Sequence, residues 1–335
     1  MAHTQSPTTV RRRSLLMGAM ALAASALTSA KALAFTALKG TVIGKNGWLF
    51  LIFDDPRKMN KPKMRQVAKT IGDAVTIFKA AKIDVVFCLT PAKSRLYREM
   101  LPDDFTFNSE TEGRYQYAAQ LLREAGGMVP DLEATLTELH KKQPDLDLFY
   151  KADTHWTAAA GEAAAREVGA QMLAHSNLPK SARPGNQLGK PVTMSFTEND
   201  LARDFPLEER RKYPPESYVM VPANPPGSGS LLDDDSADVV VIGNSYMQPK
   251  LNFSATLSNK LNRPVGLVWR VHNIGTYKAL LIYLQSDSFK KNKPKVLVLN
   301  FHEVDMELSV DSPVAWPQDF MKPEVFLDAV RKAVG

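Results

Sequence analysis

The chain of 335 residues holds a single cysteine, Cys88, so no disulfide can form within it and its stability has to come from packing. Cys88 lies in the apolar run 84–89, which favours a buried thiol over a nucleophile because no nearby group would lower its pKa. The sequence also lacks repeats, heptads and a phosphate-binding glycine loop, since residues 40–47 have the wrong spacing and no Lys-Ser or Lys-Thr pair. These absences exclude repeat proteins, coiled coils and P-loop enzymes.

A concentrated basic surface is missing as well. The formal net charge of the whole chain is +6, but residues 1–34 contain four positive charges and no negative one, and without them the charge falls to +2. The basic character is therefore mostly a property of the N-terminus. Nucleic acid is excluded as a partner, because binding it requires many phosphate contacts from one face.

The N-terminal segment is typical of an export signal. Residues 11–13 are three arginines, and a small-residue apolar stretch that is too short for a lasting membrane span follows to about Ala30. The arginines resemble a twin-arginine signal, and residues 32–34 (ALA) offer a peptidase its small residues before Phe35. We expect residues 1–34 to be a cleaved signal, with an uncleaved anchor as the alternative, and the rest of the chain to face the periplasm.

The remaining three hundred residues alternate between strand-like and helix-like segments. This alternation predicts one α/β domain over residues 35–335, with a mostly parallel sheet and helices on both of its faces. The expected helices are 61–81, 114–125, 131–142, 158–174 and 323–334, and the expected strands are 84–89, 148–150, 239–242 and 295–299. In such a sheet, ligands collect beyond the carboxyl ends of the strands.

Residues 177–236 differ in character from the rest. Prolines recur along this stretch, which also contains the run Gly-Ser-Gly-Ser at 227–230. Because these residues interrupt regular elements, we expect an irregular insertion within the domain. Such a segment serves as a lid or a binding loop, or it is a surface excursion with no role.

Two short motifs carry residues for covalent chemistry: DTHW at 153–156 and GNSY at 243–246. Together they supply a hydroxyl nucleophile in Ser245, a base in His155 and a carboxylate in Asp153 to orient the imidazole. Residues i and i+2 of an extended segment point to the same side, so Asp153 can receive the Nδ1 proton of His155 while Nε2 faces Ser245. This division of labour is the one that acyl transfer requires.

The turn around Ser245 can also stabilise a developing oxyanion. Gly243 permits a sharp turn after the strand, and backbone N–H groups together with the Asn244 side chain are candidate donors. Each motif has a structural alternative as well: a plain turn at 243–246, and helix capping by Asp153 and Thr154.

The other histidines give little competition for the role of base. His272 and His302 are the rival candidates, and His155 itself has a structural alternative as a satisfied core histidine. Trp156 is more often a core residue than a sugar platform. The histidines show no metal-ligand spacing with a third ligand, so we expect no metal site.

The sequence resembles the family of bacterial alginate O-acetyltransferases of the AlgJ/AlgX type, periplasmic proteins whose domain resembles a circularly permuted SGNH hydrolase. The specific matches are DTHWT and GNSY, in the permuted order with Asp and His before Ser. The supporting matches are GKNGWLF at 44–50, PAK at 91–93, VPDL at 129–132 and Gly161. The chain departs from the family pattern at Asn199, where a glycine is expected, and it matches only loosely at residues 300–303.

The resemblance implies an acetyl group carried on Ser245 and transferred to a polysaccharide hydroxyl, with His155 and Asp153 as partners. It implies an oxyanion site formed by Asn244 and the Ser245 backbone and lined by Tyr246 and Gly243. Trp156, Tyr246 and the insertion are expected to stack on the sugar or cover the site.

Several choices stay open at this stage. The acceptor is alginate or another exopolysaccharide, and the alternatives to a transferase are a carbohydrate esterase or deacetylase with the same triad, or a polymer-binding subunit without catalysis. No cofactor is expected. The expected partners are a membrane-bound O-acyltransferase that relays the acetyl group and other proteins of polymer export.

Overall fold

The computed structural model describes residues 37–38, 40–225, 237–271 and 273–335. The predicted export signal lies outside these residues. No helix in the described ranges is both long enough and apolar enough to span a membrane.

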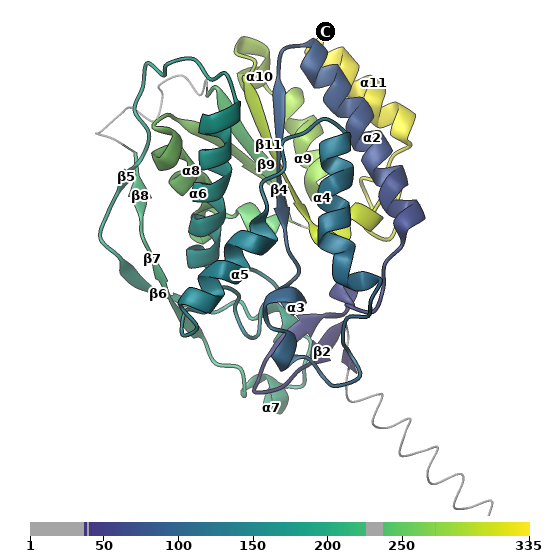
Figure 1. The fold of residues 1–335 in the computed structure, drawn as a ribbon, viewed down its shortest axis with the longest axis vertical. Coiled ribbons are helices and arrows are strands. Elements are labelled where there is room, and N and C mark those ends of the chain that lie inside the picture. The colour runs from purple at the N-terminus through teal and green to yellow at the C-terminus, as the bar shows by residue number, and fades with distance from the viewer. Residues whose placement is uncertain (1–36, 39, 226–236, 272) are drawn as a thin grey trace, which may run out of the picture.

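A four-stranded parallel sheet forms the centre of the structure (Figure 1). Its strands are β4 (Asp84–Thr90), β9 (Val239–Gly243), β10 (Val265–Trp269) and β11 (Val296–His302), in the spatial order β10, β9, β11, β4. Every residue of β9 and β11 is buried. Continuous apolar runs of this kind are expected where both faces of a parallel sheet are covered.

Helices cover both faces, as the sequence predicts. On one face lie α2 (Lys61–Ala80), α4 (Arg114–Glu124), α9 (Gly275–Leu284) and α11 (Pro323–Val334). On the other lie α5 (Leu132–Lys142), α6 (Ala158–His175) and α8 (Phe253–Leu261). Successive strand residues point to opposite faces, so Leu297 and Leu299 join one core and Val296 and Val298 the other.

Smaller elements surround the carboxyl ends of the strands. They are the antiparallel strands β1 (Ala37–Leu38), β2 (Thr41–Ile43) and β3 (Leu49–Leu51), the short helices α3 (Lys93–Leu96) and α7 (Leu207–Arg210), and the 3-10 turns η1 (Ile52–Asp54), η2 (Arg98–Met100), η3 (Thr111–Gly113), η4 (Asp200–Ala202), η5 (Ser245–Met247), η6 (Pro249–Leu251) and η7 (Glu303–Glu307). Helix α10 (Asp287–Lys291) lies at the opposite end of the sheet, before the start of β11 (Figure 1).

The segment predicted as an irregular insertion contains more structure than its prolines indicate. Strands β5 (Gln187–Leu188) and β8 (Ala223–Asn224) form one antiparallel pair, and β6 (Val192–Phe196) and β7 (Glu216–Met220) form another. Residues 226–236, which include the Gly-Ser run, lie outside the described part of the chain. The prolines therefore delimit short strands without abolishing them.

The strand predicted at residues 148–150 is wrong. Only one isolated bridge, between Phe149 and Trp156, forms there. The backbone N–H of Tyr150 bonds to the carbonyl of His155, and that of Leu148 to the hydroxyl of Tyr97. The segment therefore closes a loop on itself and does not join the sheet.

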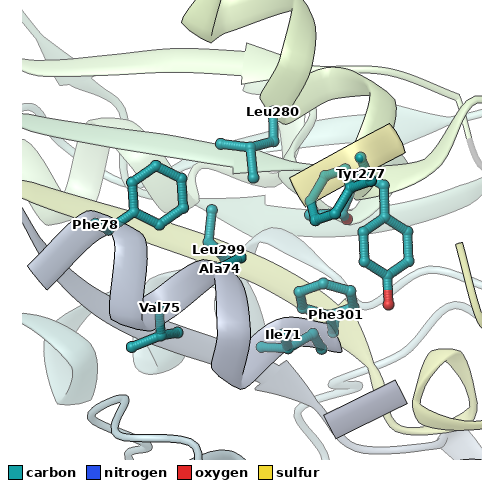
Figure 2. A pocket seen from close by; sticks show the side chains of 10 residues that line it. Ile71, Ala74, Val75, Phe78, Tyr277, Leu280, Leu299 and Phe301 are labelled. Atoms are coloured by element: carbon teal, nitrogen blue, oxygen red, sulfur yellow. The ribbon is translucent and has the colours of Figure 1, made fainter. Parts of the chain in front are cut away.

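A small cavity between α2, α9 and β11 is bounded by apolar side chains such as Ile71, Phe78 and Leu299 (Figure 2). Its volume of about 10 Å³ is at the lower limit for one water molecule. Since its lining offers almost no polar partners, this cavity is a packing gap in the core and not a ligand site.

Candidate active site

Ser245 lies just beyond the carboxyl end of β9, as the first residue of η5. Gly243 ends the strand, and a Cβ atom built on it would lie 2.6 Å from Met247 Cγ and 2.7 Å from Asn300 Cβ. Glycine is therefore required here for the close approach of β11. The sequence pointed to the same residue for a different reason, a sharp turn.

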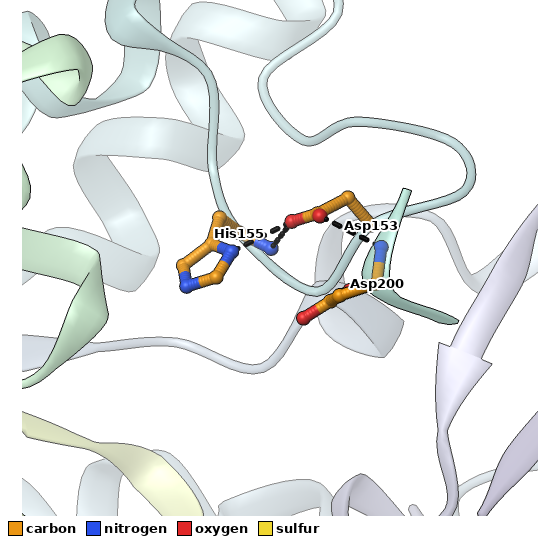
Figure 3. Close-up of side chains that lie close together, drawn as sticks. All are labelled: Asp153, His155 and Asp200. Carbon is orange, nitrogen blue, oxygen red and sulfur yellow. Dashed lines mark hydrogen bonds and ion pairs between the residues drawn. The ribbon is translucent and has the colours of Figure 1, made fainter. Parts of the chain in front are cut away.

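The structure brings the three predicted catalytic residues together. His155 Nε2 lies 2.7 Å from Ser245 Oγ, and His155 Nδ1 lies 2.6 Å from Asp153 Oδ1. Asp153 and His155 are only 0% and 6% exposed, respectively, and Figure 3 shows the imidazole held edge-on to the carboxylate. With Nδ1 occupied by Asp153, Nε2 is left to accept the proton of Ser245.

The buried pair shifts the proton affinity of both partners. Burial alone would lower the pKa of His155, but the hydrogen bond and charge of Asp153, aided by the charge of Asp200, raise it above the ordinary value. Burial alone would raise the pKa of Asp153, but the hydrogen bond and charge of His155 hold it below the usual range. The carboxylate thus stays ionised and strengthens the base.

Carboxylates hold the backbone of the loop at residues 151–155. They accept hydrogen bonds from the N–H groups of residues 151, 152, 154 and 155. The carboxylate of Glu216 in β7 accepts from residues 151 and 152, at 2.8 and 3.0 Å. Asp200 Oδ1 accepts from the N–H of Thr154 at 2.8 Å, and Asp153 Oδ1 accepts from that of His155 at 2.9 Å. Asp153 and Thr154 therefore shape this loop and do not cap α6, which begins at Ala158.

The carbonyl groups of the same loop are held by Lys93 and by neighbouring segments. The ammonium of Lys93, which is fully buried, donates to the carbonyls of Leu49, Lys151 and Asp153 at 2.6, 2.9 and 3.1 Å. Burial, opposed in part by surrounding carboxylates, lowers the pKa of Lys93 to about 8. The backbone N–H of Leu201 donates to the carbonyl of residue 152.

Tyr246 and Trp156 join the two motifs to each other. The Tyr246 hydroxyl donates to the Thr154 carbonyl at 2.8 Å, and Trp156 Nε1 donates to the Tyr246 carbonyl at 3.1 Å. Trp156 is 0% exposed and stacks on Phe253. The expectation that Trp156 contacts substrate is therefore corrected: its ring is part of the core, and its Nε1 holds the backbone of the residue that follows Ser245.

The carboxamide of Asn244 is engaged within the turn. Its Oδ1 accepts from the backbone N–H of Tyr246 at 3.0 Å, and its Nδ2 donates to Asp305 at 3.3 Å. The Ser245 N–H stands at the first position of η5, where no partner within the turn exists. The oxyanion role of Asn244, Gly243 and Tyr246 stays a prediction.

Of the two rival bases, His302 is the one that the structure describes, and no hydrogen bond to Ser245 is found for it. His302 ends β11, stacks on Tyr246 with ring centroids 5.2 Å apart, and has its Nδ1 3.6 Å from Asp54. His272 lies outside the described residues.

The sequence analysis did not assign a role in the site to Asp200, Glu216 or Lys93, the charged neighbours of the loop. Lys93 and Asn199 entered it only as points of comparison with a family. The left-handed backbone of Asn199, with φ at 41°, explains why a glycine would suit that position.

Asp153, His155 and Asp200 also form a cluster of metal-ligand types, with ligating atoms within 4.8 Å of one another. Two donors on one zinc ion, each at about 2.0–2.2 Å, lie about 3 Å or more apart. Asp153 Oδ1 and His155 Nδ1 are 2.6 Å apart, which is a hydrogen-bond distance. We therefore assign no metal to this cluster.

Residues 41–303 match the family described as "SGNH hydrolase-like domain, acetyltransferase AlgX". A probable alginate O-acetylase AlgJ from Pseudomonas syringae pv. tomato is 28% identical over 275 residues, which are 79% of this chain and 68% of that protein. The alginate biosynthesis protein AlgX from Pseudomonas fluorescens is 25% identical, over 78% of this chain and 55% of that protein.

The fold has a solved counterpart as well. The structure of the O-acetyltransferase domain of Pseudomonas putida AlgJ superposes with a TM-score of 0.70 at 24% identity, covering 88% of this chain and 99% of that one. The predicted SGNH hydrolase-like fold is thereby confirmed.

Proposed function

Because the chain belongs to the family of SGNH hydrolase-like AlgX acetyltransferases, we propose that it is an O-acetyltransferase that acetylates hydroxyls of an exopolysaccharide through Ser245. The observation that carries this proposal is the hydrogen-bonded series Ser245, His155, Asp153, with contacts of 2.7 and 2.6 Å. Relatives named as alginate O-acetylases support a polysaccharide acceptor, of which alginate is the first candidate.

The reaction proceeds in two balanced steps. Ser245 Oγ attacks the carbonyl carbon of an acetyl ester while His155 Nε2 takes the hydroxyl proton, and the donor alcohol then leaves with that proton. A sugar hydroxyl next attacks the acetyl-serine, gives its proton to His155, and Ser245 regains a proton as the acetylated sugar departs. Asp153 holds the imidazole in place and stabilises the imidazolium in both steps.

We also propose where the reaction takes place. The arginine-led signal supports export to the periplasm. Acetyl-coenzyme A is not expected there, so a membrane-bound O-acyltransferase is the proposed source of the acetyl group, with other polymer-export proteins as partners.

The test is to incubate the protein with a small activated acetyl ester, with and without an alginate oligosaccharide. We expect acetylated sugar and a transient acetyl group on Ser245 in peptide mass spectra, both lost in Ser245→Ala. Ser217→Ala, in an exposed serine of β7, serves as control and should behave like the unmodified protein.

Each alternative predicts a different outcome. Free acetate with no gain from added sugar would identify an esterase instead. Polymer binding that is indifferent to Ser245→Ala, with no acetyl transfer, would identify a binding subunit.

A further inference from the structure

We propose that Asp200 is a positioning residue for the acetyl transfer: it clasps the loop that carries Asp153 and His155, and its negative charge stabilises the imidazolium formed in each step. This inference rests on the proposed function and adds a part of the inserted segment to the site. Asp200 belongs to η4 and is 45 residues away in sequence from both His155 and Ser245.

The clasp is reciprocal. The backbone N–H of Asp200 donates to Asp153 Oδ2 at 3.0 Å, while Asp200 Oδ1 accepts from the N–H of Thr154 at 2.8 Å. Asp153 therefore divides its oxygens: Oδ1 serves His155 and Oδ2 is held by Asp200 (Figure 3). If the bond from Oδ1 to His155 or the bond from Oδ2 to the Asp200 N–H lengthens, the Asp153 carboxylate turns and the imidazole loses its alignment.

The two hydrogen bonds that Asp200 makes with the loop do not require a negative charge. An asparagine would supply the same backbone donor and the same side-chain acceptor without placing a second carboxylate beside Asp153. Burial and the charge of Asp153 raise the pKa of Asp200 to about 6, so the second charge is held at a cost. Groups with such shifts collect where chemistry needs them.

The carboxylate of Asp200 lies close to the imidazole of His155. The ligating atoms of Asp200, Asp153 and His155 lie within 4.8 Å of one another, so a proton arriving on His155 is attracted by both carboxylates. Six other charged or titratable groups surround this site: Lys250 of η6, Lys93 of α3, Glu216 of β7, Asp54 of η1, His302 of β11, and Glu198, which pairs with Lys250.

Lys250 opposes the effect of Asp200, because its charge lowers the pKa of His155. Its ion pair with Glu198 partly offsets that charge. Among these groups, Asp200 is the carboxylate besides Asp153 that raises the pKa of His155 directly.

Asp200→Asn tests the charge while it keeps the hydrogen bonds. We expect kcat/KM to fall about tenfold and the midpoint of its acid limb to move to lower pH, because the imidazole loses one of its two stabilising anions. Asp204→Asn, an exposed aspartate of the same segment, is the matched control and should leave both unchanged. Asp200→Glu keeps the negative charge, so its acid-limb midpoint should lie closer to that of the unmodified protein than the midpoint of Asp200→Asn does.

An equal loss in Asp200→Asn and Asp200→Ala with an unmoved acid limb would reduce Asp200 to a structural residue and overturn the proposal. A second readout does not need activity. The pH midpoint at which the ring resonances of His155 titrate should be lower in Asp200→Asn than in the unmodified protein, because one anion beside the imidazolium is lost. Equal midpoints would overturn the proposal, whereas a lower midpoint without acetyl transfer would sustain it while the proposed function fails.

Discussion

At the scale of the residue, one buried ammonium group organises the catalytic loop. Lys93 donates to three backbone carbonyls, one at Leu49 and two in the loop at residues 151–155. The rings of Trp48 and Phe50 lie 5.1 and 5.3 Å from its Nζ. Burial of a lysine here costs free energy, since desolvation disfavours the charged ammonium group. Its ammonium donates to all three carbonyl oxygens, of which that of Lys151 also accepts from the N–H of Leu49.

We therefore predict that Lys93→Met destabilises the fold by several kcal/mol, roughly 1–3 kcal/mol for each carbonyl left unbonded. The residual activity should fall mainly in kcat, because the loop that aligns Asp153 loosens. Chemical denaturation and steady-state kinetics measure the two effects. Lys141→Met, an exposed lysine of α5, is the control; equal stability of the two variants would contradict this role for Lys93.

The three residues proposed for catalysis were predictable from the sequence, whereas the residues that hold them in place were not. A hydroxyl, an imidazole and a carboxylate are chemically distinct, so Ser245, His155 and Asp153 could be selected from two motifs. Asp200 and Lys93 are ordinary charged residues in sequence, and their roles arise from contacts 46 and 60 residues away with Thr154 and Asp153. No local pattern encodes such contacts.

At the scale of the element, the packing of α6 on α8 and η6 places the turn that carries Ser245. Gly161 of α6 faces Leu251 of η6, and a Cβ atom at position 161 would lie 2.1 Å from the Leu251 carbonyl oxygen. The obstacle is backbone and not a flexible side chain. Even one methyl group must therefore push the two elements apart.

We predict that Gly161→Ala costs about 1–3 kcal/mol of folding free energy, although alanine is the better helix former. Activity should fall too, since η6 follows Ser245 by only a few residues. Urea denaturation provides the comparison. In Gly113→Ala the new methyl group meets nothing within 4 Å, so this control should be neutral or slightly stabilising, and matching behaviour of the two variants would refute the steric argument.

Elements with a clear apolar period were predicted to within one or two residues at each end, as α2, α4 and α11 illustrate. Among the strands of the central sheet and the helices that cover its faces, three were missed: α8, α9 and β10. Helix α9 is apolar on most sides, so its sequence has little helical period, and β10 is an edge strand whose residues are all half-buried. In these elements tertiary position, rather than local pattern, decides the structure.

At the scale of the whole molecule, distant segments converge on the catalytic loop. The N-terminal strands contribute through the N–H of Leu49, which donates to the carbonyl of Lys151, and through the hydroxyl of Thr41, which donates to the carbonyl of Leu201. The inserted segment contributes Asp200 and Glu216. Parts of the chain that the sequence marks as peripheral thus complete the site, which links acetyl transfer to the integrity of the entire fold.

A second buried network ties the carboxyl end of β11 to the helices before it. Glu303 is fully buried and accepts from Arg95 of α3 and Arg114 of α4, each at 2.7 Å. Burial alone would raise the pKa of Glu303, but the two guanidinium groups lower it to about 2, against an ordinary 4.5. A lowered folded-state pKa means that this stabilisation is fully present above about pH 4.5 and is lost as the pH falls toward 2.

The ion pairs of Glu303 should therefore make the free energy of unfolding depend on pH in the acid range. At pH 7, Glu303→Gln should cost about 3–5 kcal/mol, because two buried guanidinium groups lose their counter-charge. The gap in unfolding free energy between the unmodified protein and the variant should narrow as the pH falls from about 5 toward 2, since protonation of Glu303 removes the same charge. Urea denaturation across that range measures the gap. Glu99→Gln, at an exposed glutamate, should show a small difference at every pH, and a gap for Glu303→Gln that stays constant on acidification would mean that its ionisation does not hold the helices to the sheet.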